Sequence, residues 1–219
     1  MTPPDPSNSD SLLELLRLSQ ATIGDPFPVL LGFIVFLWVL SLFNFGILAG
    51  SLKQYGVYPR RLQGLRGIVF APLLHGDWQH LRYNTVPLLI VGTLVILQVN
   101  QYFYGVTLMA WLVGGLGVWL FGEKGTHLGA SGLIWGYCGF LLFRAILMPT
   151  VVSVSMAAIV VVFYGSLIFT GLGMPQISRG ISWQGHQFGL AGGGLAARYS
   201  AEIQQFLDLV LDLVFKAIP

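Results

Sequence analysis

Charged residues are scarce in this 219-residue chain: 9% of its residues are Asp, Glu, Lys or Arg, whereas 55% are hydrophobic. A soluble domain carries about 25% charged residues. The few charges also cluster, which leaves charge-free stretches at 26–52, 83–122, 125–143, 145–178 and 180–197. A helix that crosses a bilayer needs about 20 apolar residues, so each stretch is long enough for at least one span. The net charge of +2 gives no sign of nucleic-acid binding.

Cysteine is nearly absent as well. The single residue, Cys138, excludes an intramolecular disulfide and a thiolate metal cluster. No secretory signal peptide is expected, because the first apolar run starts near Phe27 and no basic region precedes it.

Polar and turn-forming residues divide the apolar stretches into spans. The polar run 98–101 splits the second stretch, and proline and glycine residues that favour turns lie near both ends of the fourth. We predict an all-α integral membrane protein with one domain at residues 27–199. Its six spans lie near 27–50, 83–99, 103–121, 131–148, 150–171 and 183–199. Gly, Gln and His lower the hydropathy of the last span. We still accept it as a span, because polar residues inside a membrane segment are typically functional.

The predicted domain is flanked by two amphipathic segments. Residues 1–26 form a tail in which a capping box at 11–14 predicts a short helix over 11–20. Residues 200–219 carry polar side chains at steps of four, on one helix face, at Gln204, Asp208, Asp212 and Lys216. This pattern favours an interfacial helix over a seventh span. The long connection 51–82 is basic and partly apolar, which predicts a partly ordered segment at the membrane surface.

Serine and histidine stand at matching ends of the predicted spans. Because successive spans alternate in direction, the second, fourth and sixth begin on the same side. Their starts carry His80 with Asn84, then Ser131, then His186. A hydroxyl nucleophile and an imidazole base are the minimum pair for acyl transfer, so we predict Ser131 as nucleophile and His186 as general base. No Asp or Glu lies inside a span, which favours a dyad over a triad.

Glycine spacing predicts that the fourth and sixth spans pack closely. Small residues every four positions let helix backbones approach in lipid, and they occur here at Gly132, Gly136, Gly185, Gly189 and Gly193. Such packing would bring the Ser131 hydroxyl and the His186 imidazole within hydrogen-bond reach. Trp135, one turn after Ser131, is placed to stack on His186, although an ordinary core aromatic fits the pattern equally well.

Donors for an oxyanion are available on the second span. His80 and Asn84 share a helix face, and the Ser131 backbone N–H at a helix start adds a third donor. Each residue also has a structural interpretation: a helix cap for Ser131, a packing histidine for His186, and interhelical contacts for His80 and Asn84.

Three motifs together resemble the rhomboid family of intramembrane serine proteases. They are His75-Gly76-Asp77-Trp78-Gln79-His80-Leu81-Arg82-Tyr83-Asn84, Gly129-Ala130-Ser131-Gly132, and His186-Gln187-Phe188-Gly189 with Gly193. The resemblance implies a six-helix bundle with a Ser131/His186 dyad in a water-filled cavity. It places His80 and Asn84 in the oxyanion hole, and Trp135 where the family often has a tyrosine stacked on the histidine.

The same resemblance implies a serine endopeptidase that cleaves single-span membrane proteins near the membrane surface and needs no cofactor. It also implies a multi-pass protein of a bacterial-type plasma membrane or a related organelle membrane. Two features depart from many members: residues 51–82 lack a Trp-Arg pair, and Ile96 stands where a glutamate is common.

Two other classes of protein compete with this interpretation. A membrane metal-binding protein or metalloenzyme would use His75, His80, His127 and His186 with Asp77, since imidazole and carboxylate suit zinc. The sequence lacks a His-Glu-x-x-His pattern, which counts against it. A transporter or non-catalytic scaffold would use the glycines and His186 without needing Ser131. Metal analysis and a serine-directed covalent probe discriminate these classes.

Overall fold

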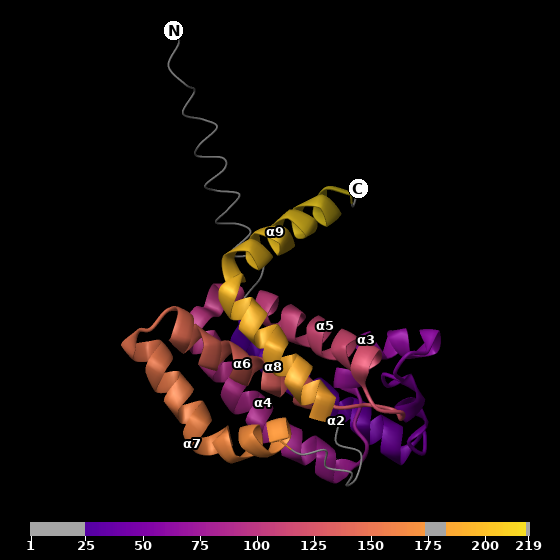
Figure 1. The fold of residues 1–219 in the computed structure, drawn as a ribbon. Coiled ribbons are helices and arrows are strands. Elements are labelled where there is room, and N and C mark those ends of the chain that lie inside the picture. The colour runs from indigo at the N-terminus through magenta and orange to yellow at the C-terminus, as the bar shows by residue number, and fades with distance from the viewer. Residues whose placement is uncertain (1–24, 174–182, 218–219) are drawn as a thin grey trace.

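The computed structural model describes residues 25–173 and 183–217, which form helices and the segments that connect them (Figure 1). The long helices are α2 (Pro26–Gly46), α4 (Trp78–Val99), α5 (Phe103–Phe121), α6 (Ser131–Leu147), α7 (Val151–Gly173), α8 (Trp183–Arg198) and α9 (Ser200–Ala217). Shorter elements are η1 (Ser51–Tyr55), η2 (Leu62–Leu65), α3 (Arg66–Phe70), η3 (Ala71–Leu73) and η4 (Asn100–Tyr102). The helix predicted over 11–20 lies outside the described residues.

Side-chain caps set several helix starts. Asp25 accepts a hydrogen bond from the Phe27 N–H at 3.0 Å, and Pro26 occupies the first helical position of α2. Asp77 caps α4 by accepting from the His80 N–H at 2.8 Å. These caps satisfy backbone donors that have no partner inside the helix.

The helices follow the predicted order of spans, with two shifted boundaries. The first helix ends at Gly46 rather than at residue 50. The second begins at Trp78 rather than at residue 83, because Asp77 caps it and the exposed Arg82 is accommodated on its surface. His80 and Asn84 therefore lie in the first two turns of α4. Two described stretches, Pro26–Gly46 and Trp78–Phe121, are long and apolar enough to cross a membrane, and Ser131–Leu147 and Val151–Ser166 are shorter apolar helices.

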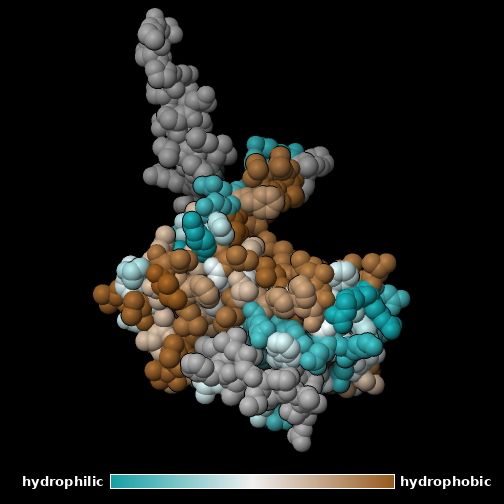
Figure 2. Space-filling model, viewed as in Figure 1, coloured by the Kyte–Doolittle hydropathy of each residue, from teal (hydrophilic) through white to brown (hydrophobic). Residues whose placement is uncertain are grey.

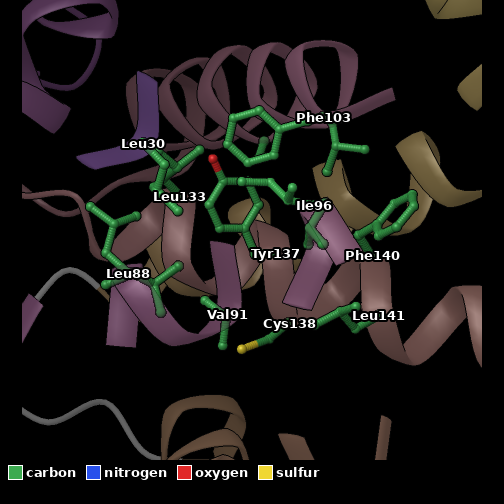
Figure 3. Packing of buried hydrophobic residues seen from close by; sticks show 14 of the residues in the cluster. Leu30, Leu88, Val91, Ile96, Phe103, Leu133, Tyr137, Cys138, Phe140 and Leu141 are labelled. Carbon is green, nitrogen blue, oxygen red and sulfur yellow. The ribbon is translucent and has the colours of Figure 1, made fainter. Parts of the chain in front are cut away.

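Helix α6 lies at the centre of the bundle and packs against α4, α5, α7 and α8, while α2 packs on α4. Figure 1 shows α7 on the side away from α3, and α9 leaving the bundle after α8. Figure 3 shows Tyr137 of α6 at the centre of the core, among residues from α2, α4 and α5. Its fully buried hydroxyl pairs with the Thr107 hydroxyl at 2.8 Å, which satisfies both groups without water.

The outer faces of the helices are apolar. Val35 of α2, Leu97 of α4 and Val162 of α7 are 60%, 68% and 77% exposed. Figure 2 shows hydrophobic residues over most of one face, with a hydrophilic band across part of it. Exposed apolar surface of this extent is typical of a protein whose surroundings are themselves apolar.

The connection between α2 and α4 is ordered and packs on α5. Val57 and His127 exchange backbone hydrogen bonds of 3.0 and 2.9 Å. The indole N–H groups of Trp111 and Trp119 donate to the carbonyl oxygens of Ile68 and Arg61, at 2.8 and 2.9 Å. This connection therefore covers the C-terminal half of α5 as a fixed layer.

Candidate active site

The loop before α6 meets the start of α4 at Gly129. Gly129 has φ +109°, a conformation that glycine adopts easily and other residues rarely do. Its N–H donates to the Ala71 carbonyl oxygen at 2.9 Å. A Cβ at this position would lie 2.6 Å from Nε2 of His80 and 3.3 Å from Nδ2 of Asn84. Backbone conformation and space both require glycine at this position. Because Gly129 has no side chain, His80 and Asn84 can lie next to the loop that leads into Ser131.

Asn84 presents an unpaired donor at this point. The residue is 5% exposed, and its Nδ2 has no hydrogen-bond partner in the described part of the chain. Leaving a buried polar group unpaired costs about 1–3 kcal/mol, and such groups are rare in folded proteins. The N–H groups of this side chain are therefore free to donate to an acceptor that is not part of the described chain.

Ser131 is the first residue of α6 and does not cap it. Ala130 occupies the N-cap position, and no side chain bonds to the free backbone groups there. The half-buried serine lines a cavity of about 50 Å³ together with Gly129, Gly132 and Gly185. Ile68 and Pro72, from the connection that covers α5, line the same cavity. Ser131 therefore borders a space between α5, α6, α8 and this connection.

His186 lies in the first turn of α8, where the Trp135 ring stacks on it. The ring centroids are 4.7 Å apart and the planes are inclined by 11°. Ser131 and Trp135 are one turn apart on α6, so the stack fixes the imidazole on the face of α6 that carries the serine. The hydrogen bonds formed between described residues do not include one from Ser131 to His186. The predicted hydrogen bond between hydroxyl and imidazole therefore stays a prediction.

Glycines set the distance between α6 and α8. A Cβ on Gly189 would collide with the Gly132 carbonyl oxygen, and one on Gly193 with the Gly136 carbonyl oxygen. A Cβ on Gly132 would lie 3.3 Å from the Gly185 carbonyl oxygen. All five glycines singled out in the sequence therefore lie where these two helix backbones approach each other.

A second glycine contact, between α5 and α8, was missed in the sequence. A Cβ on Gly117 would collide with the Phe188 ring, and one on Gly192 would lie 2.8 Å from the Met109 carbonyl oxygen. A Cβ on Gly114 would lie 3.6 Å from the backbone of Gly189. The signal was present in the glycines of 114–117, which indicate that α8 is held between α5 and α6.

The two acidic residues nearest the site have other partners. The Asp77 carboxylate caps α4, and the Glu123 carboxylate accepts from the Trp183 indole at 3.2 Å. His127 Nε2 pairs with the Glu123 carbonyl oxygen at 2.9 Å. No three His, Cys, Asp or Glu side chains within 25–173 and 183–217 gather closely enough to hold a metal ion. The four histidines of the metal hypothesis are not brought together as a ligand set.

His75 lies just before α4; the sequence places it at the start of the first rhomboid-like motif and, in the competing interpretation, among the metal ligands. It is 1% exposed, and neither ring nitrogen has a partner among the residues that the structure describes. Its ring meets the His80 ring edge to face, with centroids 5.3 Å apart and planes at 74°. Burial, reinforced by His80, lowers the pKa of His75 to about 3. His75 is therefore a neutral ring that packs against His80.

Comparisons with known proteins identify the family of this chain. The family model of the Rhomboid domain matches residues 62–202, which include every candidate residue named above. The chain is 37% identical over 175 residues to Uncharacterized protein Rv1337 of Mycobacterium tuberculosis and to Uncharacterized protein Mb1372 of Mycobacterium bovis, covering 77% of this chain and 72% of each relative. It is also 37% identical over 176 residues to Uncharacterized protein ML1171 of Mycobacterium leprae, covering 77% of this chain and 68% of that one. The chain is therefore an α-helical membrane protein that belongs to the rhomboid family.

Proposed function

We propose that this protein is an intramembrane serine endopeptidase. Ser131 is the nucleophile, His186 is the general base, and His80, Asn84 and the Ser131 N–H form the oxyanion hole. The substrates are single-span membrane proteins, cleaved near the membrane surface. The observation that carries the proposal is the unpaired Asn84 amide beside Gly129, two residues from a serine that opens onto a cavity.

We take α2 and α4 to α8 as six membrane spans. Successive spans then run in opposite directions. The starts of α4, α6 and α8 then share one membrane side, which we call the active-site end. Trp78, Ser131 and Trp183 are the first residues of these three helices, so the reactive groups lie within about two turns of that surface. This depth favours substrate bonds at the end of a transmembrane helix rather than at its centre.

The reaction proceeds in two acyl-transfer steps. The Ser131 oxygen attacks the scissile carbonyl carbon while His186 takes the hydroxyl proton, and the oxyanion accepts hydrogen bonds from the oxyanion hole. The C–N bond then breaks as the imidazolium gives its proton to the leaving amine. Water, deprotonated by His186, attacks the acyl ester and releases the carboxyl product and the free serine. The first step requires a hydrogen bond from the Ser131 hydroxyl to the His186 imidazole.

Trp135 serves this chemistry by holding the imidazole. A dyad lacks the carboxylate that orients the histidine in a triad. The stacked indole supplies an orientation in its place, at a site where both acidic neighbours are engaged elsewhere.

The test uses full-length protein reconstituted in vesicles with a single-span test substrate. We expect cleavage by the wild type and none by Ser131→Ala or His186→Ala, with melting temperatures unchanged. A fluorophosphonate probe should label Ser131, identified by peptide mass spectrometry. Cleavage by well-folded Ser131→Ala protein would exclude the proposal. Inhibition by a chelator that only added metal reverses would favour a metalloenzyme instead.

A further inference from the structure

The connection between α2 and α4 carries a basic surface without acidic neighbours. Residues 51–76 contain no Asp or Glu and four cations, Lys53, Arg60, Arg61 and Arg66. The three arginines are exposed and Lys53 is half-buried. None of the four forms an ion pair with a described residue. A concentration of unpaired positive charge on one segment indicates an anionic partner.

Close backbone contacts on its inner face fix the segment that carries these cations. A Cβ on Gly64 would collide with the Tyr58 backbone, and one on Gly67 with the backbone of residues 56 and 57. The Arg60 N–H donates to the Trp119 carbonyl oxygen at 2.9 Å. The segment is thus closely packed within itself and against α5. Its outer face therefore has a defined conformation.

Aromatic rings orient three of the cations. Arg61 lies over the Tyr58 ring at 4.7 Å, Arg66 over the Tyr55 ring at 4.5 Å, and Lys53 over the Phe45 ring at 5.5 Å. A guanidinium that stacks through its face keeps its N–H groups at the edge, where they suit a phosphate. Arg66 also donates one N–H to the Gln54 carbonyl oxygen at 3.4 Å. The stacking thus holds these groups in place without neutralising their charge.

Exposed apolar side chains accompany the arginines. Leu62 is 81% exposed, Val69 55% and Phe70 44%. These side chains follow the arginines within a few residues, and hydrophilic residues gather where this segment lies in Figures 1 and 2. Basic groups beside outward apolar groups are typical of elements that lie at the boundary between headgroups and acyl chains.

The position of the segment along α5 matches that boundary. Arg60 donates through Nη1 to the Leu120 carbonyl oxygen at 3.1 Å, next to the last residue of α5. Trp119, Tyr55 and Tyr58 lie in the same region, and tryptophan and tyrosine are enriched where membrane helices leave the bilayer. The arginines therefore lie beside the end of α5, at the active-site end of the bundle.

We propose that the outer face of residues 53–70 is a binding site for anionic phospholipid headgroups, with Arg61 and Arg66 contacting the phosphate. The apolar side chains of Leu62, Val69 and Phe70 enter the acyl boundary beside them. Bound lipid fixes the connection at the membrane surface and thereby holds the layer that lines the Ser131 cavity.

The test measures lipid binding without any activity assay, so its outcome is independent of the proposed protease function. Full-length protein in detergent micelles is titrated with phosphatidylglycerol, and the rise in melting temperature gives an apparent dissociation constant. Phosphatidylcholine serves as the zwitterionic comparison. A basic residue near an anionic surface contributes about 1 kcal/mol, which corresponds to about fivefold in affinity. We expect Arg61→Gln with Arg66→Gln to weaken phosphatidylglycerol binding by roughly 25-fold.

Matched variants separate this site from general charge effects. Arg198→Gln is the control, because Arg198 is also exposed and stacks on a tyrosine, Tyr199, at 5.2 Å, but lies at the opposite end of α8. It should bind phosphatidylglycerol as the wild type does. Arg61→Lys with Arg66→Lys should keep most of the affinity, and Leu62→Asn should weaken binding without loss of fold, since Leu62 is 81% exposed.

Four results would overturn the proposal. The first is equal stabilisation by phosphatidylcholine and phosphatidylglycerol, and the second is unchanged affinity of the double glutamine variant. The third is a loss of affinity in the Arg198→Gln control as large as in the double variant, which would indicate a diffuse charge effect. The fourth is the full shift with inorganic phosphate alone, which would identify a site for a free anion rather than for a lipid.

Discussion

The indole of Trp135 lies flat against the imidazole of His186, with 4.7 Å between the ring centroids and 11° between the planes. Each ring belongs to a different helix, so the stack is a contact between α6 and α8 as well as a support for the proposed base. Because no carboxylate in the described part of the chain forms a hydrogen bond with the imidazole, loss of the stack should affect chemistry more than substrate binding.

Trp135→Ala tests this relationship. Misplacement of a catalytic group by about 1 Å can cost 10²-fold in rate, so we expect kcat to fall by about that factor while KM changes little. Because Trp135 is buried, a lower melting temperature is also expected. Trp135→Tyr keeps an aromatic face and should restore most of the turnover. Equal kcat in all three proteins would show that the stack only contributes to packing.

Asn84→Ala should separate activity from stability. The unpaired Nδ2 is a cost in the folded protein, so its removal should leave the melting temperature unchanged or raised. Turnover should fall by about 10²- to 10³-fold, because an oxyanion donor is lost.

The control for Asn84 lies on the same helix. Gln98 has an unpaired buried oxygen near the far end of α4. Gln98→Leu should not lower turnover. A fall in melting temperature in Asn84→Ala, proportional to the loss of activity, would assign Asn84 to the fold instead.

Gly189→Ala should damage both stability and activity. The added Cβ collides with the Gly132 carbonyl oxygen, which forces α6 and α8 apart next to the dyad. Gly32→Ala in α2 is the matched control, since its Cβ meets nothing within 4 Å and alanine favours a helix over glycine by about 1 kcal/mol. Melting temperature and kcat of both variants check the prediction. Wild-type values for Gly189→Ala would show that the helices can separate at no cost.

The helices and the meeting of their starts could be predicted from the sequence, because both depend on properties local to each segment. Apolar length predicts the helices, and alternation of direction predicts that the starts of α4, α6 and α8 lie at one end. The charge pattern predicts a start at residue 83, five residues after the observed start of α4 at Trp78, because Arg82 ends a charge-free stretch. A long basic side chain near a helix end reaches the surface easily, so Arg82 does not end the helix.

What the sequence could not supply depends on contacts between distant segments. The unpaired state of Asn84, the role of Gly129 and the attachment of residues 51–73 to α5 each require the positions of two or more elements. The hydroxyl–imidazole contact was expected from close packing, but a hydrogen bond needs side-chain orientations that backbone approach alone does not fix.

His75 predicts a dependence of stability on pH. Its folded pKa of about 3 lies below the ordinary value of 6.5, so above pH 6.5 both states are neutral and its contribution to stability is complete. As the pH falls from 6.5 toward 3, His75 binds a proton in the unfolded chain but not in the folded chain, so the free energy of unfolding decreases. His75→Phe keeps a ring against His80 and removes this proton uptake. We expect a smaller drop in melting temperature between pH 7.5 and 4.5 than in the wild type, and an equal drop would contradict the assignment.

The last prediction concerns which side of the membrane the active-site end faces. The family resemblance implies a cytoplasmic N-terminus and an active-site end outside. Basic residues argue the reverse, since connections at the active-site end carry more of them than those at the other end. The lipid site proposed for Arg61 and Arg66 gives part of this excess a different role, and we therefore predict an external active-site end.

Single-cysteine labelling decides between the two orientations. Cys138 is 3% exposed and is replaced by alanine, which leaves a chain without thiols. Cysteines are then placed singly at Leu62 and at Glu202, which are exposed at opposite ends of the bundle. Intact cells are treated with a membrane-impermeant thiol reagent, and permeabilised cells serve as the control for reactivity. We expect labelling at position 62 only. Labelling at position 202 only would mean that the basic residues set the orientation and that the active-site end faces the cytoplasm.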